Sequence, residues 1–199
     1  MKISEATFAG SSTRVAQRPS RRLPEFAFIG RSNVGKSSLI NMLCNNSKLA
    51  MTSSTPGKTK LVNHFLINDS WYLVDLPGYG YANAPQKVRN EIHSVISDYV
   101  SRSDELVMLF VLVDCRYDIT RIDLDFLAEL GENEVPFAII FTKTDKIGPN
   151  VLREQILRDR EIISASGWEE LPDMLESSSA AHRGRDEILG YIDNILKTL

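Results

Sequence analysis

One stretch of the sequence combines residue types and spacing suited to binding phosphate groups. It fits the pattern G-x-x-x-x-G-K-[ST] and reads Gly30-Arg31-Ser32-Asn33-Val34-Gly35-Lys36-Ser37. The glycines let the backbone curl so that successive amide groups face inward as an anion nest. The Lys36 ammonium can reach the β- and γ-phosphates, and the Ser37 hydroxyl is a hard oxygen ligand for Mg²⁺. The stretch therefore predicts a nucleoside triphosphate site with magnesium.

The flanking residues supply the strand and the helix that this pattern needs. Glu25 to Ile29 is a short apolar run, from which we expect a buried strand. Ser38 to Cys44 carries apolar residues at helical spacing. A chance match in a glycine-containing turn would lack both neighbours. We therefore interpret the stretch as a phosphate-binding loop at a helix N-terminus.

A second loop with chemical potential follows the expected strand Trp71 to Val74. It reads Asp75-Leu76-Pro77-Gly78, a D-x-x-G pattern. The carboxylate can hold a water molecule on Mg²⁺, and the Gly78 amide can meet the γ-phosphate. A simple strand-ending turn also fits these four residues, so the interpretation depends on the phosphate loop that precedes them.

A third loop indicates which base is bound. Thr142-Lys143-Thr144-Asp145 fits [NT]-K-x-D and follows the expected strand Pro136 to Phe141. An aspartate here can accept hydrogen bonds from both N1–H and N2–H₂ of guanine, a donor pair that adenine lacks. The Lys143 stem can cover the base plane while its ammonium stays in water. The loop therefore favours GTP and argues against an ATPase.

The guanine O6 would be met by backbone amides of one further loop, and the sequence offers two. Ser177-Ser178-Ser179 lies between the last expected strand, Glu170 to Glu176, and the last expected helix, Asp186 to Leu196. Ser164-Ala165-Ser166 ends an expected helix that starts at Val151. A base-binding loop should follow a strand, so we choose Ser177 to Ser179.

Composition and charge indicate an ordinary globular domain. The chain has 199 residues, 43% of them hydrophobic and 25% charged, with a net charge of −3. Residues 1–22 carry five basic side chains against Glu5 alone, a net of +4. This basic arm can dock on phosphates, although a solvated tail explains the composition as well.

Several features favour a cytoplasmic protein. Cys44 and Cys115 sit among apolar neighbours and are expected to be reduced, buried thiols. The longest apolar run, Leu106 to Val113, is eight residues and is too short to span a bilayer. The N-terminus has no apolar signal segment.

The remaining pattern alternates strands and helices, which predicts a mostly parallel α/β sheet. Leu61 to Ile67 and Trp71 to Val74 should pair as a hairpin across the turn Asn68 to Ser70. Asn45 to Lys60 is a long loop, and loops of that length are usually functional. We further expect an edge strand at Lys2 to Phe8, and helices at Gln86 to Tyr99, Asp123 to Leu130 with Gly131 as its cap, and Val151 to Ile163.

Taken together, the chain resembles the translation-factor-type small GTPases. It is most similar to the EngB family (also called YihA or YsxC) among the TrmE-Era-EngA-EngB-septin-like P-loop GTPases. The resemblance covers nearly the whole chain and rests on Gly30 to Ser38, Thr55-Pro56-Gly57-Lys58-Thr59, Asp75-Leu76-Pro77-Gly78-Tyr79-Gly80-Tyr81-Ala82 and Thr142 to Asp145. The string from Asp75 to Ala82 is the most discriminating of the four.

The resemblance implies a fold and a division of the chain. The fold is a three-layer α/β G domain of the Ras-like kind, with a mixed, mostly parallel sheet of six or seven strands and helices on both faces. Residues 1–22 would form an N-terminal edge strand and basic connector, and residues 23–199 a single G domain. We expect a monomer.

The resemblance also assigns two mobile switches. Thr59 corresponds to the switch I threonine, a Mg²⁺ ligand and γ-phosphate sensor, within Gly57, Lys58, Thr59, Lys60 and Leu61. Switch II is Asp75, Leu76, Pro77 and Gly78. Magnesium would then bind Ser37 and Thr59 directly and Asp75 through water. Catalysis would rest on positioning and charge neutralisation by Lys36, Thr59 and Gly78.

Two residues bear on the rate of GTP hydrolysis. Many GTPases place a water-orienting glutamine directly after D-x-x-G, and here that position holds Tyr79. We therefore expect slow turnover, on the scale of roughly 10⁻⁴ s⁻¹ known for intrinsic Ras-like hydrolysis. Related GTPases without this glutamine often carry asparagine at the position of Asn33 and use K⁺. Asn33 could instead brace the loop through a side-chain hydrogen bond, and both interpretations stay open.

The resemblance points to bacterial GTP-binding proteins tied to ribosome assembly and cell division. In one interpretation the chain is a switch that docks on the 50S subunit, with phosphate contacts from Lys58, Lys60, Lys87, Arg89 and the N-terminal arginines. In the alternative it is a septation factor that binds a division protein, with GTP as a state marker. The family resemblance favours ribosome assembly.

Overall fold

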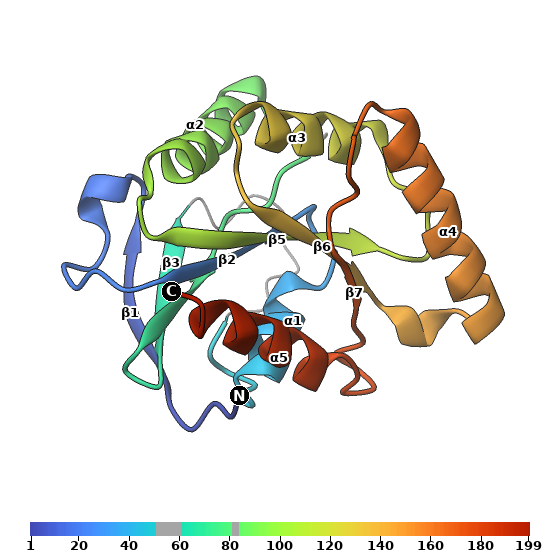
Figure 1. Cartoon of the computed structure of the whole chain (residues 1–199). Coiled ribbons are helices and arrows are strands. Elements are labelled where there is room, and N and C mark those ends of the chain that lie inside the picture. Colours follow the sequence, from blue (N-terminus) through green and yellow to red (C-terminus); the bar gives the residue numbers. More distant parts are fainter. Residues whose placement is uncertain (51–60, 81–83) are drawn as a thin grey trace.

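The computed structural model describes residues 1–50, 61–80 and 84–199 of the chain. One seven-stranded sheet has the strand order β1-β3-β4-β2-β5-β6-β7 (Figure 1). β3 runs antiparallel to both β1 and β4, and the other neighbouring pairs are parallel. The strands are β1 (Ala6–Ser12), β2 (Glu25–Gly30), β3 (Val62–Ile67), β4 (Trp71–Asp75), β5 (Leu106–Asp114), β6 (Phe137–Thr142) and β7 (Met174–Glu176).

Helices cover both faces of the sheet, which gives three layers (Figure 1). On one face, apolar residues of α2 (Gln86–Arg102), α3 (Arg121–Glu132) and α4 (Pro149–Ala165) join one core cluster. On the other face, α1 (Lys36–Leu43) and α5 (Arg185–Leu196) share the second cluster. β2 contributes side chains to the two clusters alternately, because successive side chains of a strand point to opposite faces of the sheet. Ala27 and Ile29 face the first cluster, and Phe26 and Phe28 face the second.

These observations confirm the predicted three-layer α/β fold, and the sheet has seven strands. The predicted hairpin forms, with β3 and β4 antiparallel across the Asn68–Ser70 turn. The parallel strands β2 and β5 are buried from both sides, which explains why their sequences are continuous apolar runs without alternation. Each helix begins and ends within three residues of its predicted position.

The first strand differs from the prediction, because it begins at Ala6 and not at Lys2. The residues before it wrap around the β3–β4 turn, where Asn68 Oδ1 accepts hydrogen bonds from the amides of Ser4 (2.8 Å) and Glu5 (3.1 Å). The strand then continues past Phe8, because the pairing register shifts between Phe8 and Gly10. Such a bulge lets a strand bend and keep its partner.

Gly131 is not the cap of α3, which corrects a second prediction. It lies inside the helix, whose C-cap is Asn133. A Cβ atom at Gly131 would lie only 2.6 Å from the Trp168 ring, so the glycine allows the loop after α4 to pack against α3. At the other end, α3 begins at Arg121, where Thr120 and Asp123 form a capping box.

The basic N-terminal connector is tied to the domain by its arginines. The Arg18 side chain is 6% exposed, contacts Glu105 and donates from Nη1 to the Ser103 hydroxyl at 2.9 Å. Arg22 donates to Glu105 at 3.1 Å, and Arg21 contacts Asp69. The side chains of Arg21 and Arg22 remain half-exposed. Arg18 is therefore not available to RNA phosphates, which corrects the expectation for that residue.

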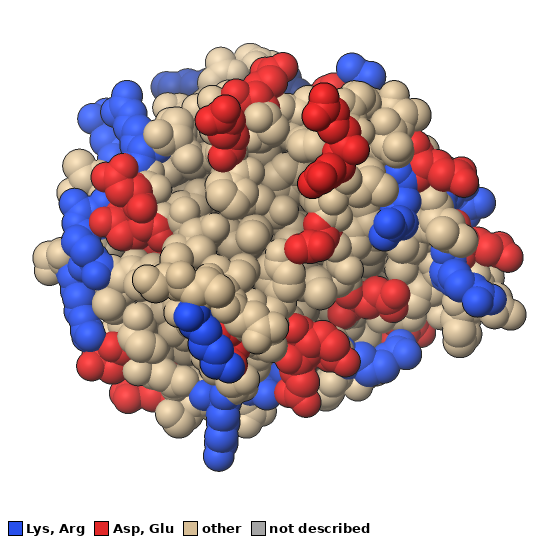
Figure 2. All heavy atoms as spheres, in the orientation of Figure 1, with Lys and Arg blue, Asp and Glu red and all other residues tan. Residues whose placement is uncertain are grey.

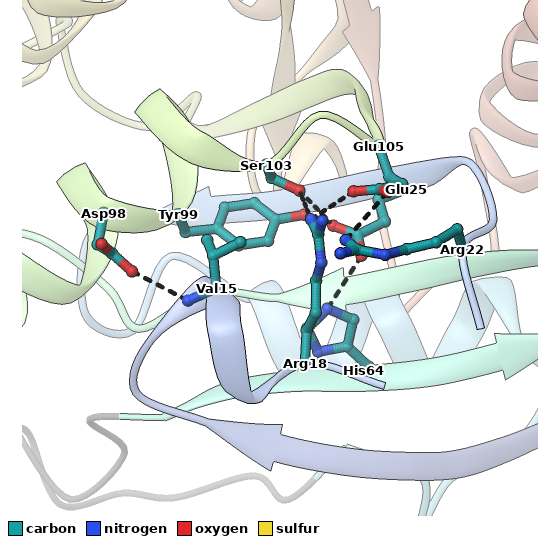
Figure 3. Close-up of polar contacts among 9 residues, drawn as sticks. All are labelled: Val15, Arg18, Arg22, Glu25, His64, Asp98, Tyr99, Ser103 and Glu105. Carbon is teal, nitrogen blue, oxygen red and sulfur yellow. Dashed lines mark hydrogen bonds and ion pairs between the residues drawn. The ribbon is translucent and has the colours of Figure 1, made fainter. Parts of the chain in front are cut away.

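Arg18 belongs to a buried polar group at the amino end of β2 (Figure 3). Glu25 Oε1 lies 3.2 Å from His64 Nε2, and Glu25 Oε2 accepts from the Tyr99 hydroxyl at 2.6 Å and from the Ser103 hydroxyl at 2.9 Å. This group joins the connector, β2, β3 and α2 at the end of β2 opposite to Gly30. We call it the Glu25 cluster; its members are Arg18, Glu25, His64, Tyr99, Ser103 and Glu105.

Both cysteines are free and buried, as the sequence predicts. Burial raises the pKa of Cys44 to about 12 and that of Cys115 to about 11, so both thiols stay protonated at neutral pH. Within residues 1–50, 61–80 and 84–199, no helix has the length and apolar character needed to cross a bilayer.

Candidate functional site

The candidate site lies where the carboxyl ends of the parallel strands meet, which is where α/β sheets commonly bind ligands. The stretch Gly30 to Ser37 connects the end of β2 to the start of α1. A Cβ atom at Gly30 would lie 2.8 Å from Val34 and 3.0 Å from Leu112, so no larger residue fits at the first position of the loop. Gly35 is the N-cap of α1 and has a φ of +106°, a conformation that favours glycine.

Lys36 and Asp75 bring the phosphate loop and the D-x-x-G loop together. The Lys36 ammonium contacts Asp75 Oδ1, and both side chains are largely buried. Asp75 is the last residue of β4, which pairs with β2, and β2 leads into the phosphate loop that carries Lys36. The pairing of these two strands therefore places Asp75 near Lys36. Leu76 is fully buried and donates its amide to Phe28 O at 3.0 Å. Pro77 and Gly78 follow at the same edge of the sheet.

The donor set beside Lys36 fits a magnesium site of the P-loop kind. Ser37 is in the first turn of α1, and the Asp75 carboxylate lies at the adjacent strand end. A hydroxyl and a carboxylate are the hard oxygen donors that Mg²⁺ takes, and Mg²⁺ usually completes its shell with water and substrate phosphates. Within the described ranges, no group of three or more His, Cys, Asp or Glu side chains could hold a metal alone.

The loop Thr142 to Asp145 is fastened directly to the phosphate loop. The Lys143 ammonium donates to Asn33 O at 2.7 Å and to Asp114 Oδ2 at 2.8 Å. The Thr142 hydroxyl donates to Val34 O at 2.7 Å. These bonds fix the separation between the phosphate end and the base end of the site.

Asp145 faces the serine loop that follows β7. The Ser178 hydroxyl donates to Asp145 Oδ1 at 2.6 Å, and this bond, with Lys146 nearby, lowers the pKa of the Asp145 carboxyl. The carboxylate is therefore ionised at neutral pH, and each of its oxygens can accept more than one hydrogen bond. The Thr144 amide donates to Ser177 O at 3.2 Å, which joins the two loops through the backbone.

These loops surround one open cleft of about 610 Å³. Its lining includes residues from the phosphate loop, from α1, from the loop after β6 and from the serine loop, among them Gly35, Ser38, Asn41, Thr142, Lys143, Asp145, Ser179 and His182. Ser177 and Ser178 are buried beneath the cleft, and Ser179 lines it. In contrast, Ser164 and Ala165 end α4 and Ser166 is its C-cap. The structure thus brings the phosphate loop and the third and fourth loops to one cavity.

Asp114 is a residue of this site that sequence reasoning missed. It is the last residue of β5 and pairs with Lys143 and Arg116. Burial opposes its ionisation, but hydrogen bonds from Arg116 and Lys143 outweigh burial and lower its pKa. The available signal was its position, because Asp75 and Asp114 both end a buried strand of the parallel part of the sheet.

Asn33 has a structural reason of its own to be asparagine. Its φ is +63°, a left-handed conformation that asparagine adopts more readily than most residues. Its carbonyl accepts the Lys143 hydrogen bond, while its side chain makes no hydrogen bond within the described part of the chain. Among the described residues, it is therefore the backbone of Asn33 that joins the phosphate loop to Lys143.

Switch I lies almost wholly outside the described residues. Gly57, Lys58, Thr59 and Lys60 fall in the range 51–60, so the structure does not place the predicted Mg²⁺ ligand Thr59. Leu61 is exposed and directly precedes β3.

Solved structures with a similar fold are GTP-binding proteins. A crystal structure of a probable GTP-binding protein EngB superposes with a TM-score of 0.70 at 22% identity, covering 88% of this chain and all of that one. Era of Aquifex aeolicus, solved with GDP and AlF₄⁻, gives a TM-score of 0.66 at 22% identity and covers 86% of this chain and 56% of that one. At this identity the likeness shows the fold alone.

Residues 25–143, more than half of the chain, match the family model described as 50S ribosome-binding GTPase, so the protein is a GTP-binding member of the P-loop GTPases. A probable GTP-binding protein EngB of Phocaeicola vulgatus is 54% identical over 100% of this chain and 99% of its own. A protein of the same name from Porphyromonas gingivalis is 51% identical over 100% and 98%. This chain belongs to the EngB family.

Proposed function

We propose that the chain binds GTP in the cleft and hydrolyses it slowly to GDP and phosphate, as a two-state switch. The observation that carries this proposal is the convergence of Lys36, Asp75 and Asp145 on one edge of the sheet. The backbone amides of Gly30 to Ser37 and the Lys36 ammonium would hold the phosphates. Asp145 would select guanine, Lys143 would cover its plane, and the Ser177 to Ser179 amides would meet O6.

The switch mechanism follows from contacts that only a triphosphate can make. The Gly78 amide and the Thr59 hydroxyl would hold the γ-phosphate, and loss of that phosphate would release both loops. Ser37 and Thr59 would ligate Mg²⁺ and Asp75 would hold one of its waters; the ion neutralises charge on the phosphates. Lys36 must exchange its contact with Asp75 for the phosphates when nucleotide binds.

Slow turnover is proposed because no described residue takes the role of the missing glutamine. The Tyr79 hydroxyl donates to Asp123 on α3 and so is engaged away from the phosphates. K⁺ at Asn33 is the proposed compensation, since its amide oxygen is a neutral hard ligand and a cation there would balance transition-state charge. GTP turnover in KCl and in NaCl at equal ionic strength, measured for wild type and Asn33→Ala, tests this proposal. If each protein has the same rate in the two salts, K⁺ does not take part.

We propose the 50S ribosomal subunit as the partner, in large-subunit assembly in the cytoplasm. The support is the family description and an open groove of about 770 Å³, whose charged lining residues are Arg14, Lys87 and Glu91. The two basic side chains can bind phosphates. Arg89 is exposed on the same helix. By contrast, the face in Figure 2 mixes acidic and basic side chains, so it offers no single-sign field to RNA.

Salt-dependent co-sedimentation with 50S particles, in GTP and in GDP, tests the partner. Wild type should bind in the GTP state, and the charge reversals Lys87→Glu and Arg89→Glu should each weaken binding. Arg102→Glu is a matched control, because it is the same charge reversal at an exposed arginine at the far end of the same helix. Binding that is absent in both nucleotide states would instead favour the septation role, with a division protein as partner.

A further inference from the structure

Tyr79 directly follows Gly78, and its side chain packs on α3. Its hydroxyl donates to Asp123 Oδ1 at 2.8 Å. Its ring stacks on Phe126 with centroids 4.5 Å apart and planes 25° apart. Tyr79 is only 8% exposed and Asp123 only 3%. A buried hydrogen bond therefore joins the residue after the D-x-x-G motif to the first turn of α3.

Both partners of this bond are fixed in the required state. Burial and the negative charge of Asp123 raise the pKa of Tyr79 well above its usual value, so the hydroxyl keeps its proton and donates it. The second oxygen of Asp123 accepts from the Thr120 amide at 3.0 Å and from the Thr120 hydroxyl at 2.5 Å. The acceptor thus belongs to the cap of α3 and cannot move freely.

The backbone of this segment is also bound to the phosphate loop. The Tyr79 amide donates to Gly30 O at 3.3 Å, and Tyr79 forms a parallel bridge with Arg31. Gly80 turns with a φ of +74°, and a Cβ atom there would lie 3.4 Å from Arg31 Nε and 3.5 Å from Ile122. The chain at residues 79–80 is held between the phosphate loop and α3, immediately after Gly78.

We propose that Tyr79 is a positioning residue that, through its bond to Asp123, holds the Gly78 amide where it meets the γ-phosphate. This inference rests on the proposed function, in particular on the Gly78 contact. At a position where other GTPases orient water with glutamine, this chain would use a buried tyrosine to stabilise the triphosphate state. GDP has no γ-phosphate, so the bond should favour GTP binding and leave GDP binding unchanged.

Dissociation constants for GDP and for the non-hydrolysable analogue GppNHp, measured with Mg²⁺ present, test the proposal. Tyr79→Phe keeps the stacked ring and removes only the hydroxyl, and should weaken GppNHp about tenfold, the loss of one hydrogen bond to a charged group. GDP affinity should stay within about twofold, since its contacts are unchanged. Tyr191→Phe is the matched control, because it removes a tyrosine bond of 2.7 Å to Asp173 away from the cleft.

Two further variants separate this inference from the proposed function. Asp123→Asn approaches the bond from its other end and should shift the GppNHp-to-GDP affinity ratio in the same direction, with little further change in the double variant. Gly78→Pro removes the amide hydrogen and tests the γ-phosphate contact itself, with GDP affinity as the check that the variant folds. A ratio altered by Gly78→Pro but not by Tyr79→Phe overturns the role of Tyr79 alone. A ratio that Gly78→Pro leaves unchanged overturns the contact and the inference with it. Equal losses of GDP and GppNHp in Tyr79→Phe also overturn it, because they indicate a merely structural role.

Discussion

The two ends of β2 both carry polar and charged groups, and they use them in opposite ways. At the carboxyl end, after Gly30, Asp145 lines an open cleft of about 610 Å³. Lys36 contacts Asp75 of the neighbouring D-x-x-G loop. At the amino end, both oxygens of Glu25 are occupied by His64, Tyr99 and Ser103 inside the protein (Figure 3). One strand therefore leads to the candidate nucleotide site at one end and to a closed internal network at the other.

The difference shows why charge in a buried place does not by itself indicate function. A buried carboxylate needs partners, because an unpaired one is costly. Glu25 obtains them from its own fold. Burial opposes its ionisation, but His64, Tyr99 and Ser103 together outweigh burial and lower its pKa. Asp145 keeps acceptor capacity toward a cavity. What distinguishes the two ends is whether the hydrogen-bond partners of the carboxylate are all residues of the protein or can include a ligand.

The largest effect is expected from Asp145→Asn at the nucleotide end. The substitution replaces an acceptor with a donor opposite guanine N1–H, and leaving buried polar groups unpaired costs about 1–3 kcal/mol each. GTP affinity should fall about 100-fold or more on that basis, and xanthosine triphosphate, which offers the complementary acceptor, should bind better.

The control is thermal unfolding of the nucleotide-free protein, where Asp145→Asn should cost no more than about 1 kcal/mol, because asparagine keeps an oxygen that can accept the Ser178 hydroxyl. Unchanged GTP affinity would show that Thr142 to Asp145 does not read the base.

The next effect is expected at the other end, from Glu25→Gln. Three buried bonds to a charged acceptor lose strength, and hydrogen bonds to charged groups are worth about 1.5–3 kcal/mol, so we expect a loss of about 2 kcal/mol in unfolding free energy. GTP and GDP affinities should be unchanged. Glu129→Gln is a suitable control, because that carboxylate pairs with His93 at the surface. If Glu25→Gln weakened nucleotide binding more than it reduced stability, the two ends would be coupled.

A smaller effect is expected from Arg18→Ala, which removes the link between the connector and the Glu25 cluster. Arg18 donates to Ser103 and contacts Glu105, which retains Arg22 as a partner. We expect a loss of about 1 kcal/mol, because the bond to Ser103 and the contact with Glu105 are both removed, while Arg22 remains as a cation beside Glu105. Chemical denaturation measures it, with Arg14→Ala as the control from the same connector.

The sequence predicted the nucleotide end far better than the Glu25 end. The phosphate loop, the D-x-x-G loop and the loop at Thr142 each follow an apolar strand, so local pattern and position suffice to place them. The Glu25 cluster joins residues up to 87 positions apart, from Arg18 to Glu105, and only the tertiary fold brings them together. The role of Gly131 was also beyond local reasoning, because its neighbour is Trp168.

The shift of β1 has the same cause. A strand at Lys2 to Phe8 fits its own composition, but Asn68 binds the preceding residues and moves the paired segment to Ala6–Ser12. Side chains that act over long separations override local preference at chain ends, where few backbone partners compete.

The smallest predicted effect is a pH dependence that belongs to the Glu25 end alone. Glu25 faces His64 on β3 and Tyr99 and Ser103 on α2, and its pKa in the folded state lies below its usual 4.5. Its ionised form therefore stabilises the fold fully above pH 4.5, and this contribution is lost as pH falls through the folded pKa. Unfolding free energies of wild type and Glu25→Gln should thus converge between neutral and acidic pH, because protonation removes the charge that distinguishes the two side chains. Denaturation curves at pH 7 and pH 4 measure the difference, and Glu129→Gln should show no such convergence. A gap between wild type and Glu25→Gln that is the same at both pH values would mean that packing, and not the charge of Glu25, stabilises this end of β2.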